Sequence, residues 1–329
     1  MSTEIVGIDV AAKKLAVSAS GLRLAAEYDN TPAGRVQLIA RLRAADRPVR
    51  VVLEATGIYF LDLACELAAA QVPVMVINPK AAHHFAEAMM QRRKDDPVDA
   101  AMLCAFGRAM AFVPWTAPPP AAFQLRDLAR HVSRLGKTIA AAKNQLHAAR
   151  ATTLASPVAI AVLERQIGHD EALVEELLAE ARRLAAADPR LARRCALADS
   201  IPGVAERSAV LLTGELALLP ETMSASQWVA QAGLDVREER SGASLNRRPR
   251  ISKRGNRRLR EALFYPALTA ARCCPQASAF VDRLVAGGLT RMQAIIALMR
   301  KLLHGLHAMW RTDQPFDPAK LFRTAGAPP

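Results

Sequence analysis

The sequence has few of the features that mark secreted and membrane proteins. Its five cysteines form no CxxC pair and show no Cys/His spacing typical of a zinc site, which favours a reducing compartment over a disulfide framework. No apolar run is long enough to span a bilayer. The first ten residues, MSTEIVGIDV, lack the basic and apolar regions of a signal peptide. These absences predict a cytoplasmic protein without a membrane-spanning segment.

Aromatic residues are also scarce, and acids are outnumbered by bases. Aromatics make up only 5% of the chain whereas alanine is abundant, which favours helices. The formal net charge is +13. Residues 241–260 contain eight of the basic residues and no acid, so the excess is local. A local basic excess predicts a polyanionic partner, with nucleic acid as the first candidate and an anionic membrane surface as the second.

The N-terminal third of the chain has the pattern of an α/β domain. A chain of 329 residues is too long for one ordinary core, so two or three domains are expected. Apolar and β-branched runs predict strands over 3–10, 14–20, near 22–28, 49–56 and 72–79. Helical spacing predicts helices over 33–45, 58–70, 80–91 and 97–110. This order predicts a mixed sheet covered by helices, in a domain over 1–113.

A proline-rich linker at 114–120 leads into a helical middle region, which we place at 114–195. An a/d heptad seam runs over three heptads, and a second helix near 174–184 continues the pattern. The seam consists of Leu125, Leu128, Val132, Leu135, Ile139, Ala142 and Leu146. It fits either an antiparallel helical hairpin or an intermolecular coiled coil.

A mainly helical domain is expected over 196–312, followed by a tail at 313–329. It opens with SIPGV, in which Pro202 and Gly203 precede an apolar helix. This turn resembles a helix-hairpin-helix loop, in which N–H groups at a helix start meet a phosphate. Gly203 is therefore a candidate contact to nucleic acid.

Four acids of the N-terminal domain are candidates for one site. Asp9 ends the strand VGID and Glu54 ends the strand VVLE, so they lie side by side if the two strands are neighbours. Asp96 and Asp99, three residues apart at a helix start, project from one face. Converging carboxylates need cations, and hard oxygen ligands suit Mg²⁺ in phosphoryl transfer. The alternative is an acid pair that favours the helix dipole and two unrelated surface acids.

The basic segment is the second candidate site. Its cationic side chains are Arg247, Arg248, Arg250, Lys253, Arg254, Arg257, Arg258 and Arg260. We expect them to contact phosphates, with an affinity that falls steeply with salt. Ser241 lies just ahead of them. The residues alone allow it to be either a nucleophile or a loop serine before Gly242, and Ser244 is the nearest competing candidate for the nucleophile. No histidine lies near it in sequence, so a Ser-His-Asp triad is not indicated.

Several short motifs occur together in one order. They are GIDVAAKKLAVS, LEATGIY, KDDPVDAAML, KNQLHA, SIPGV and AGL…SG…ISKRGNRRLREAL. In this order, over roughly residues 4 to 310, the chain resembles the DEDD transposases of insertion-sequence-110 type. The resemblance implies an RNase H-like, RuvC-like N-terminal domain, an oligomerising coiled coil and a C-terminal transposase domain.

The resemblance also implies roles for individual residues. Asp9, Glu54, Asp96 and Asp99 would be the catalytic carboxylates that bind Mg²⁺ or Mn²⁺, and Ser241 the serine of the SG motif. The family usually reads K-T-D-x-x-D-A, and here Asp95 replaces the threonine. The register of the motif favours Asp96 over Asp95 as the metal ligand.

Members of this family are recombinases guided by a structured bridge RNA, which pairs with donor and target DNA. The resemblance therefore implies a prokaryotic enzyme that works at the nucleoid as a dimer or tetramer and forms a phosphoserine–DNA intermediate. Two alternatives stay open. One is a RuvC-like, structure-specific endonuclease with water as the nucleophile, and the other is a non-enzymatic nucleic-acid-binding protein.

Overall fold

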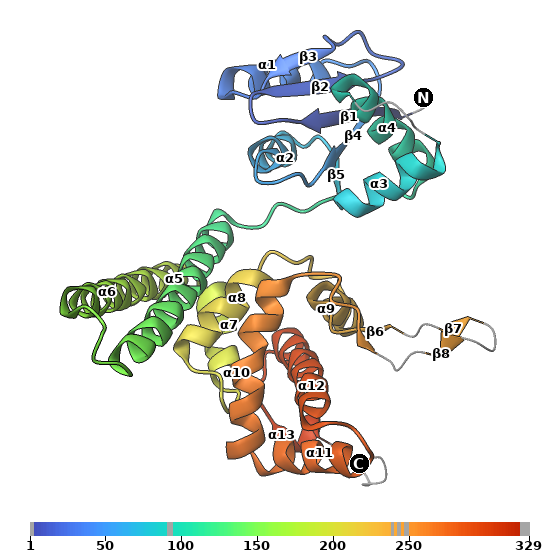
Figure 1. The fold of residues 1–329 in the computed structure, drawn as a ribbon. Coiled ribbons are helices and arrows are strands. Elements are labelled where there is room, and N and C mark those ends of the chain that lie inside the picture. Colours follow the sequence, from blue (N-terminus) through green and yellow to red (C-terminus); the bar gives the residue numbers. More distant parts are fainter. Residues whose placement is uncertain (1–2, 91–94, 238–239, 242–244, 247–249, 323–329) are drawn as a thin grey trace. The chain divides into compact units, whose positions relative to one another are not determined.

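The computed structural model describes residues 3–90, 95–237, 240–241, 245–246 and 250–322. The chain divides into two compact units, Met1–Ala117 and Pro118–Pro329, whose boundary falls inside the proline-rich segment at 114–120 (Figure 1). The finer division of the second unit at 195 stays a prediction. Among the described residues, no helix is both long and apolar enough to cross a membrane.

The first unit is built on a five-stranded sheet of order β3-β2-β1-β4-β5. Its strands are β1 (Glu4–Val10), β2 (Lys14–Ser18), β3 (Glu27–Asp29), β4 (Val49–Glu54) and β5 (Val74–Ile77). The first three strands pair antiparallel, whereas β4 pairs parallel with both β1 and β5. The predicted mixed, RNase H-like sheet is confirmed, although its third strand is shorter and later than the pattern near 22–28 indicates.

Helices cover both faces of this sheet. They are α1 (Pro32–Arg43), α2 (Phe60–Ala69), α3 (Pro79–Ala88) and α4 (Asp96–Ala109). Because side chains alternate along a strand, Val6 and Ile8 of β1 pack with α1 and α2 on one face. Ile5 lies on the opposite face, in a second apolar cluster with residues of α3 and α4. Gly7 and Asp9 share this second face with Ile5.

The approach of α4 to the sheet leaves no room for side chains at two glycines. A Cβ atom on Gly7 would lie 2.1 Å from the carbonyl oxygen of Ala100 and 2.4 Å from the backbone nitrogen of Cys104. A Cβ atom on Gly107 of α4 would lie 2.6 Å from a methyl group of Val52 in β4. Backbone atoms cannot move aside as a flexible side chain can, so Gly7 fixes how closely α4 lies on β1.

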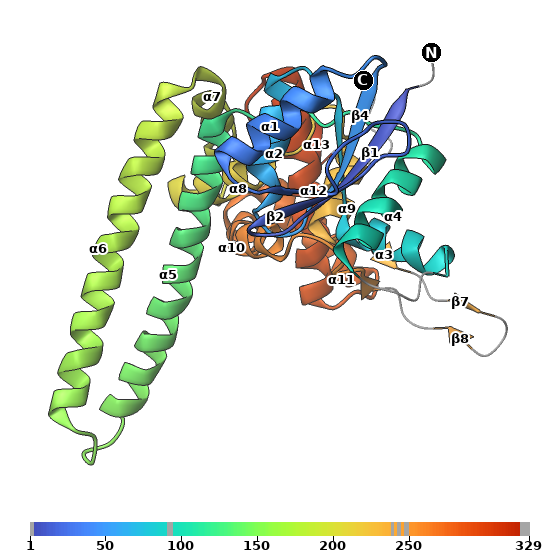
Figure 2. The ribbon, with the colours of Figure 1, turned by 90° about the horizontal axis from the view of Figure 1, so that it is seen from above.

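The second unit begins with a long antiparallel helical hairpin. Helices α5 (Pro120–Arg150) and α6 (Pro157–Ala187) lie side by side along their length (Figure 2). Residues of the predicted seam, such as Leu125, Val132 and Ile139, are buried against α6 residues that include Val174 and Leu178. The heptads allow a hairpin or an intermolecular coiled coil. In the structure, the seam of α5 is covered by α6 of the same chain, as in a hairpin.

The rest of the second unit is mainly helical, as expected. Its helices are α7 (Pro189–Asp199), α8 (Glu206–Leu216), α9 (Ala225–Ala232), α10 (Arg257–Cys273), α11 (Pro275–Ala286), α12 (Arg291–Thr312) and α13 (Pro318–Leu321). Helix α13 falls in the segment predicted as a tail, and Leu321 packs against Gly305 of α12. Two short strand pairs were not predicted: β6 (Val236–Arg237) with β9 (Arg250–Ile251), and β7 (Arg240–Ser241) with β8 (Leu245–Asn246).

The contrast between Gly7 and Gly168 gives a test of the close approach of α4. We expect Gly7→Ala to lower the free energy of unfolding of the first unit by about 1–3 kcal/mol or more, because the added methyl group meets backbone atoms. Gly168→Ala, in the exposed interior of α6 where an added Cβ meets nothing within 4 Å, should instead stabilise by about 0.5–1 kcal/mol. Thermal and denaturant unfolding measure both changes. Equal effects of the two substitutions would contradict the described packing.

Candidate active site

Two of the candidate acids, Asp9 and Glu54, end neighbouring parallel strands. The register of β1 and β4 pairs Ile8 with Leu53, so Asp9 and Glu54 follow one residue later at the same edge of the sheet. Residues two apart on a strand share a face of the sheet. Gly7 and Val52 both contact α4, so Asp9 and Glu54, two residues further along β1 and β4, lie on the face that α4 covers. The condition set by the sequence, that the two strands be neighbours, is met.

Helix α4 carries the other two acids in its first turn. Its N-cap is Asp95, whose carboxylate accepts a hydrogen bond from the backbone N–H of Val98 at 3.1 Å. Pro97 occupies the first turn, where its missing N–H costs no helical hydrogen bond. Asp96 and Asp99 are the acids of that turn. Asp95 thus caps the helix, whereas Asp96 and Asp99 lie three residues apart within its first turn.

The electrostatics of Asp9 show that the four carboxylates influence one another. The pKa of Asp9 rises from 3.8 to about 6, first because the side chain is half-buried, then because the carboxylates of Asp99, Asp96 and Glu54 repel its charge. A hydrogen bond from the Val10 N–H opposes the rise without cancelling it. Asp9 therefore lies close enough to the other three carboxylates for their charges to oppose its ionisation.

This donor set fits a divalent cation in its chemistry. Four carboxylates offer hard oxygen ligands of the kind that Mg²⁺ and Mn²⁺ prefer, and their mutual repulsion is what bound positive charge relieves. Within the residues that the structure describes, no three His, Cys, Asp or Glu side chains are already gathered as a metal site. The four carboxylates thus lie in one region of the first unit, but they do not yet surround a common metal position.

Two polar side chains near the sheet edge, which the sequence pattern did not single out, hold the loops beyond β1 and β4. Thr56 donates a hydrogen bond from its hydroxyl to a carboxylate oxygen of Glu54 at 2.7 Å. The Asn30 amide donates to the carbonyl oxygens of Ala11 and Tyr59, at 2.9 and 3.3 Å. Its own side-chain oxygen accepts from Arg35 at 3.2 Å. No periodicity marks Asn30, since its partners lie 19 and 29 residues away.

Ser241 lies in the second unit, on the short strand β7. Its backbone pairs antiparallel with β8, with Ser241 opposite Leu245. Its competitor Ser244 lies outside the described residues. The structure thus gives Ser241 a place in a strand pair within the second unit.

The basic segment runs from the strand β9 into the helix α10. Arg250 lies in β9, and Lys253, Arg254, Arg257 and Arg258 are exposed. Arg260 is partly buried and donates a hydrogen bond to the Ala232 carbonyl at 2.7 Å. Arg247 and Arg248 lie outside the described residues.

Gly203 packs against α10. With φ at +92° it adopts a left-handed conformation, and a Cβ there would lie 2.7 Å from the carbonyl oxygen of Pro266. Pro202 and Gly203 lead into α8, as the sequence indicates. The close packing of this turn against α10 is enough to explain why a glycine is needed here. Its contact with nucleic acid stays a prediction.

A buried carboxylate under the start of α10 was also not foreseen. Glu215 of α8 is almost fully buried and receives two hydrogen bonds from the Arg130 guanidinium, at 2.6 and 3.0 Å. The Asn256 amide donates to it at 2.6 Å. Burial would raise the pKa of Glu215, but these hydrogen bonds outweigh burial and the pKa is lowered. The hint in the sequence is an acid within the otherwise apolar run AVLLTGEL.

Known proteins match both units of the chain. Residues 6–153 match the family model of the DEDD transposases of IS110 type, described as a transposase, and residues 195–282 match the model described as transposase IS116/IS110/IS902 family. The chain is 29% identical to a pilin gene-inverting protein of Moraxella bovis over 271 residues, which is 82% of each chain. It is 28% identical to that of Moraxella lacunata over 295 residues, 88% of this chain and 89% of the relative.

A third relative matches a shorter stretch. It is an uncharacterized 43.6 kDa protein of the insertion element IS110 in Streptomyces coelicolor, 31% identical over 112 residues, or 34% of this chain and 27% of the relative. Together the two family models span most of the chain, and the N-terminal one matches the unit that holds the acids. The chain therefore belongs to the IS110 family of transposases, enzymes that cleave and rejoin DNA.

Proposed function

We propose that this protein is an RNA-guided DNA recombinase with a carboxylate site for Mg²⁺ or Mn²⁺ in its first unit and a serine nucleophile in its second. The observation that carries the carboxylate half is the arrangement of β1, β4 and α4, which brings Asp9, Glu54, Asp96 and Asp99 to one edge of the sheet. The raised pKa of Asp9 supports it, because all three other acids contribute to the rise.

The four carboxylates would hold the metal, which when bound stabilises negative charge on the oxygens of a phosphodiester in transfer. Asp9 contributes only when it has lost its proton. Thr56 fixes one oxygen of Glu54 by donating to it, and so limits the rotation of that carboxylate. Asp95 keeps the first turn of α4 in place by capping it, which holds Asp96 and Asp99 at the sheet edge.

The proposed nucleophile is the hydroxyl of Ser241. Its oxygen attacks the phosphorus of a DNA phosphodiester and gives up its proton, the bond from phosphorus to one sugar oxygen breaks, and that oxygen takes up a proton and leaves as a hydroxyl. The products are a phosphoserine–DNA ester and a free DNA hydroxyl end. One phosphodiester is exchanged for another, so attack by the hydroxyl of a second strand reverses the step and joins new partners without ATP.

The guide RNA and the assembly belong to the same proposal. The exposed arginine and lysine side chains of the segment 250–258 can contact the phosphates of DNA and of a structured RNA alike. If base pairing with RNA selects the sites, the protein itself needs to read mainly shape and backbone. Donor and target together present four strands, which calls for several active sites and hence for a dimer or a tetramer.

Site-specific inversion is the second candidate. It is favoured by the two relatives named as pilin gene-inverting proteins, each of which matches more than four fifths of this chain. Inversion and insertion use the same cleavage and rejoining, and differ in whether the two recombining sites lie on one molecule. The alternative of an endonuclease with water as nucleophile differs from both, since it leaves no protein on the DNA.

The acidic site predicts a linked dependence on pH and metal. Because the folded pKa of Asp9 lies above its usual value, its contribution to stability is present at low pH and lost as the pH rises through about 6. We expect Mg²⁺ to raise the melting temperature at pH 8 and to have little effect at pH 5. Asp9→Asn should raise the metal-free melting temperature at pH 8 and abolish the Mg²⁺ response. Asp46→Asn, at an exposed acid paired with Arg47, is the matched control. An equal Mg²⁺ response in wild type and Asp9→Asn rules out the site.

Ser241 is tested by trapping the covalent intermediate. With junction DNA, guide RNA and Mg²⁺, wild-type protein should form an adduct that survives a denaturing gel. Ser241→Ala should form none while it still binds RNA, because only the hydroxyl is removed. Ser244→Ala should keep the adduct. Adducts in Ser241→Ala would disprove the assignment, and free DNA ends without attached protein in the wild type would favour the endonuclease.

Guidance by RNA is tested in a plasmid recombination assay. The protein is supplied with RNA transcribed from the DNA that flanks its gene. We expect recombination to require this RNA and to move to a new target when the pairing segment of the RNA is rewritten. Recombination at an unchanged rate without the RNA would show that the protein selects its sites by itself.

A further inference from the structure

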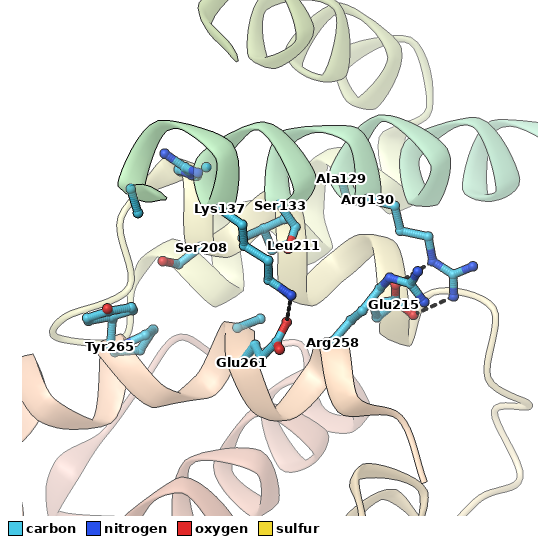
Figure 3. A pocket seen from close by; sticks show the side chains of 15 residues that line it. Ala129, Arg130, Ser133, Lys137, Ser208, Leu211, Glu215, Arg258, Glu261 and Tyr265 are labelled. Atoms are coloured by element: carbon cyan, nitrogen blue, oxygen red, sulfur yellow. Dashed lines mark hydrogen bonds and ion pairs between the residues drawn. The ribbon is translucent and has the colours of Figure 1, made fainter. Parts of the chain in front are cut away.

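Helix α10 stands between two hollows of the second unit. The first, of about 580 Å³, lies between α5, α8 and α10 (Figure 3). The second, of about 500 Å³, lies between α10, the segment around Lys253 and the start of α12. Glu261 and Tyr265 of α10 line both hollows, so these two side chains occupy the ridge between them.

Positive charge dominates both hollows. Arg130, Lys137, Arg207 and Arg258 line the first, and Lys253, Arg257 and Arg260 line the second. The acids are two: Glu215, which is buried and held by Arg130 and Asn256, and Glu261, which pairs with Lys137 at 2.6 Å and with Arg257 at 2.8 Å. Cations thus outnumber acids across the ridge.

The crowding of guanidinium groups shows in a neighbouring side chain. The pKa of Arg126 is lowered, first by burial and then by the charge of Arg130, with a smaller contribution from Arg258. Such mutual repulsion is relieved when an anion binds among the cations. The lining of the first hollow by Arg130, Lys137, Arg207 and Arg258 is what suits it to a phosphate group.

Tyr265 gives the ridge a feature that phosphate binding alone does not require. Its side chain is 73% exposed, whereas most of the few aromatic side chains in this chain are partly or fully buried. The ring packs edge-on against Phe264, with ring centroids 5.5 Å apart, which supports it from one side. An exposed ring between two cationic hollows is the combination by which proteins bind single-stranded nucleic acid.

The helix offers a hydrogen-bond acceptor beside the ring. Pro266 lies inside α10 and has no N–H, so the Ala262 carbonyl lacks its usual helical donor. Both residues line the first hollow.

We propose that the two hollows and Tyr265 form a track for single-stranded nucleic acid across α10, with phosphates among the cations and one base stacked on the Tyr265 ring. A duplex does not fit this role, because its bases are already stacked and only an unpaired base can lie on the ring. The track deepens the proposed recombinase function, on which it rests for its nucleic-acid partner. It serves either the displaced DNA strand or an unpaired stretch of the guide RNA.

The test is a binding measurement that needs no cleavage. The full chain with Ser241→Ala is titrated in EDTA with labelled single-stranded DNA, single-stranded RNA of the same sequence, and duplex DNA. Adding Tyr265→Ala should raise the Kd for single strands by about 5- to 150-fold, the range of base–aromatic stacking, and leave duplex binding unchanged. Tyr265→Phe should keep the affinity. A loss confined to DNA or to RNA identifies which strand uses the track.

The cations are tested by salt dependence with a matched control. Arg258→Gln should reduce the slope of log Kd against log salt by about 0.7 for a single strand, the value for one phosphate contact. Arg165→Gln, at an exposed arginine of α6 away from the hollows, should leave the slope unchanged. Both variants change surface side chains, so folding should be unaffected.

Three results would overturn the track. They are an unchanged single-strand affinity in Tyr265→Ala, an equal loss on duplex DNA, and a change in the oligomeric mass of Tyr265→Ala with unaltered binding, which would make the ridge a contact between copies. None depends on the covalent chemistry. A failed adduct assay with an intact Tyr265 effect would reject the recombinase mechanism alone, and the reverse outcome would reject the track alone.

Discussion

The close contact between α4 and the sheet is the constraint on which the first unit depends. It is made by the absence of side chains at Gly7 on the strand and Gly107 on the helix. Because backbone meets backbone at Gly7, the helix has little freedom to shift along or away from β1. The acids in its first turn are thereby held at the edge where β1 and β4 end, close enough for their charges to raise the pKa of Asp9.

The second unit is organised around a buried charge. Glu215 joins α8 to α5 through Arg130 and to the start of α10 through Asn256. Removing one member of such a set leaves an uncompensated charge in the interior, which is far more costly than never having had the pair. The geometry between these three helices, and with it the first hollow, is therefore set by electrostatics as well as by apolar packing.

Much of this architecture was readable from the sequence, because it depends on local patterns. The β-branched runs located four of the five strands of the sheet, and the heptads located α5. The acids could be singled out as candidates because each ends a strand or begins a helix. Asn30, Glu215 and Arg130 were not found, since their partners lie far away in sequence and no periodicity links them. The short strands β6 to β9 escaped because two residues are too few to carry an alternating pattern.

The two ends of the Asn256 side chain have different tasks. Its oxygen accepts from the N–H groups of Arg258 and Leu259 and caps α10, while its nitrogen donates to Glu215. The amide can therefore be neither flipped nor replaced by a carboxylate without losing one task. Arg257 and Arg258 follow directly, so they rise from a helical turn that is pre-organised before any phosphate arrives. In the proposed contacts with phosphates, their backbone would lose less conformational entropy than that of basic residues on a flexible loop.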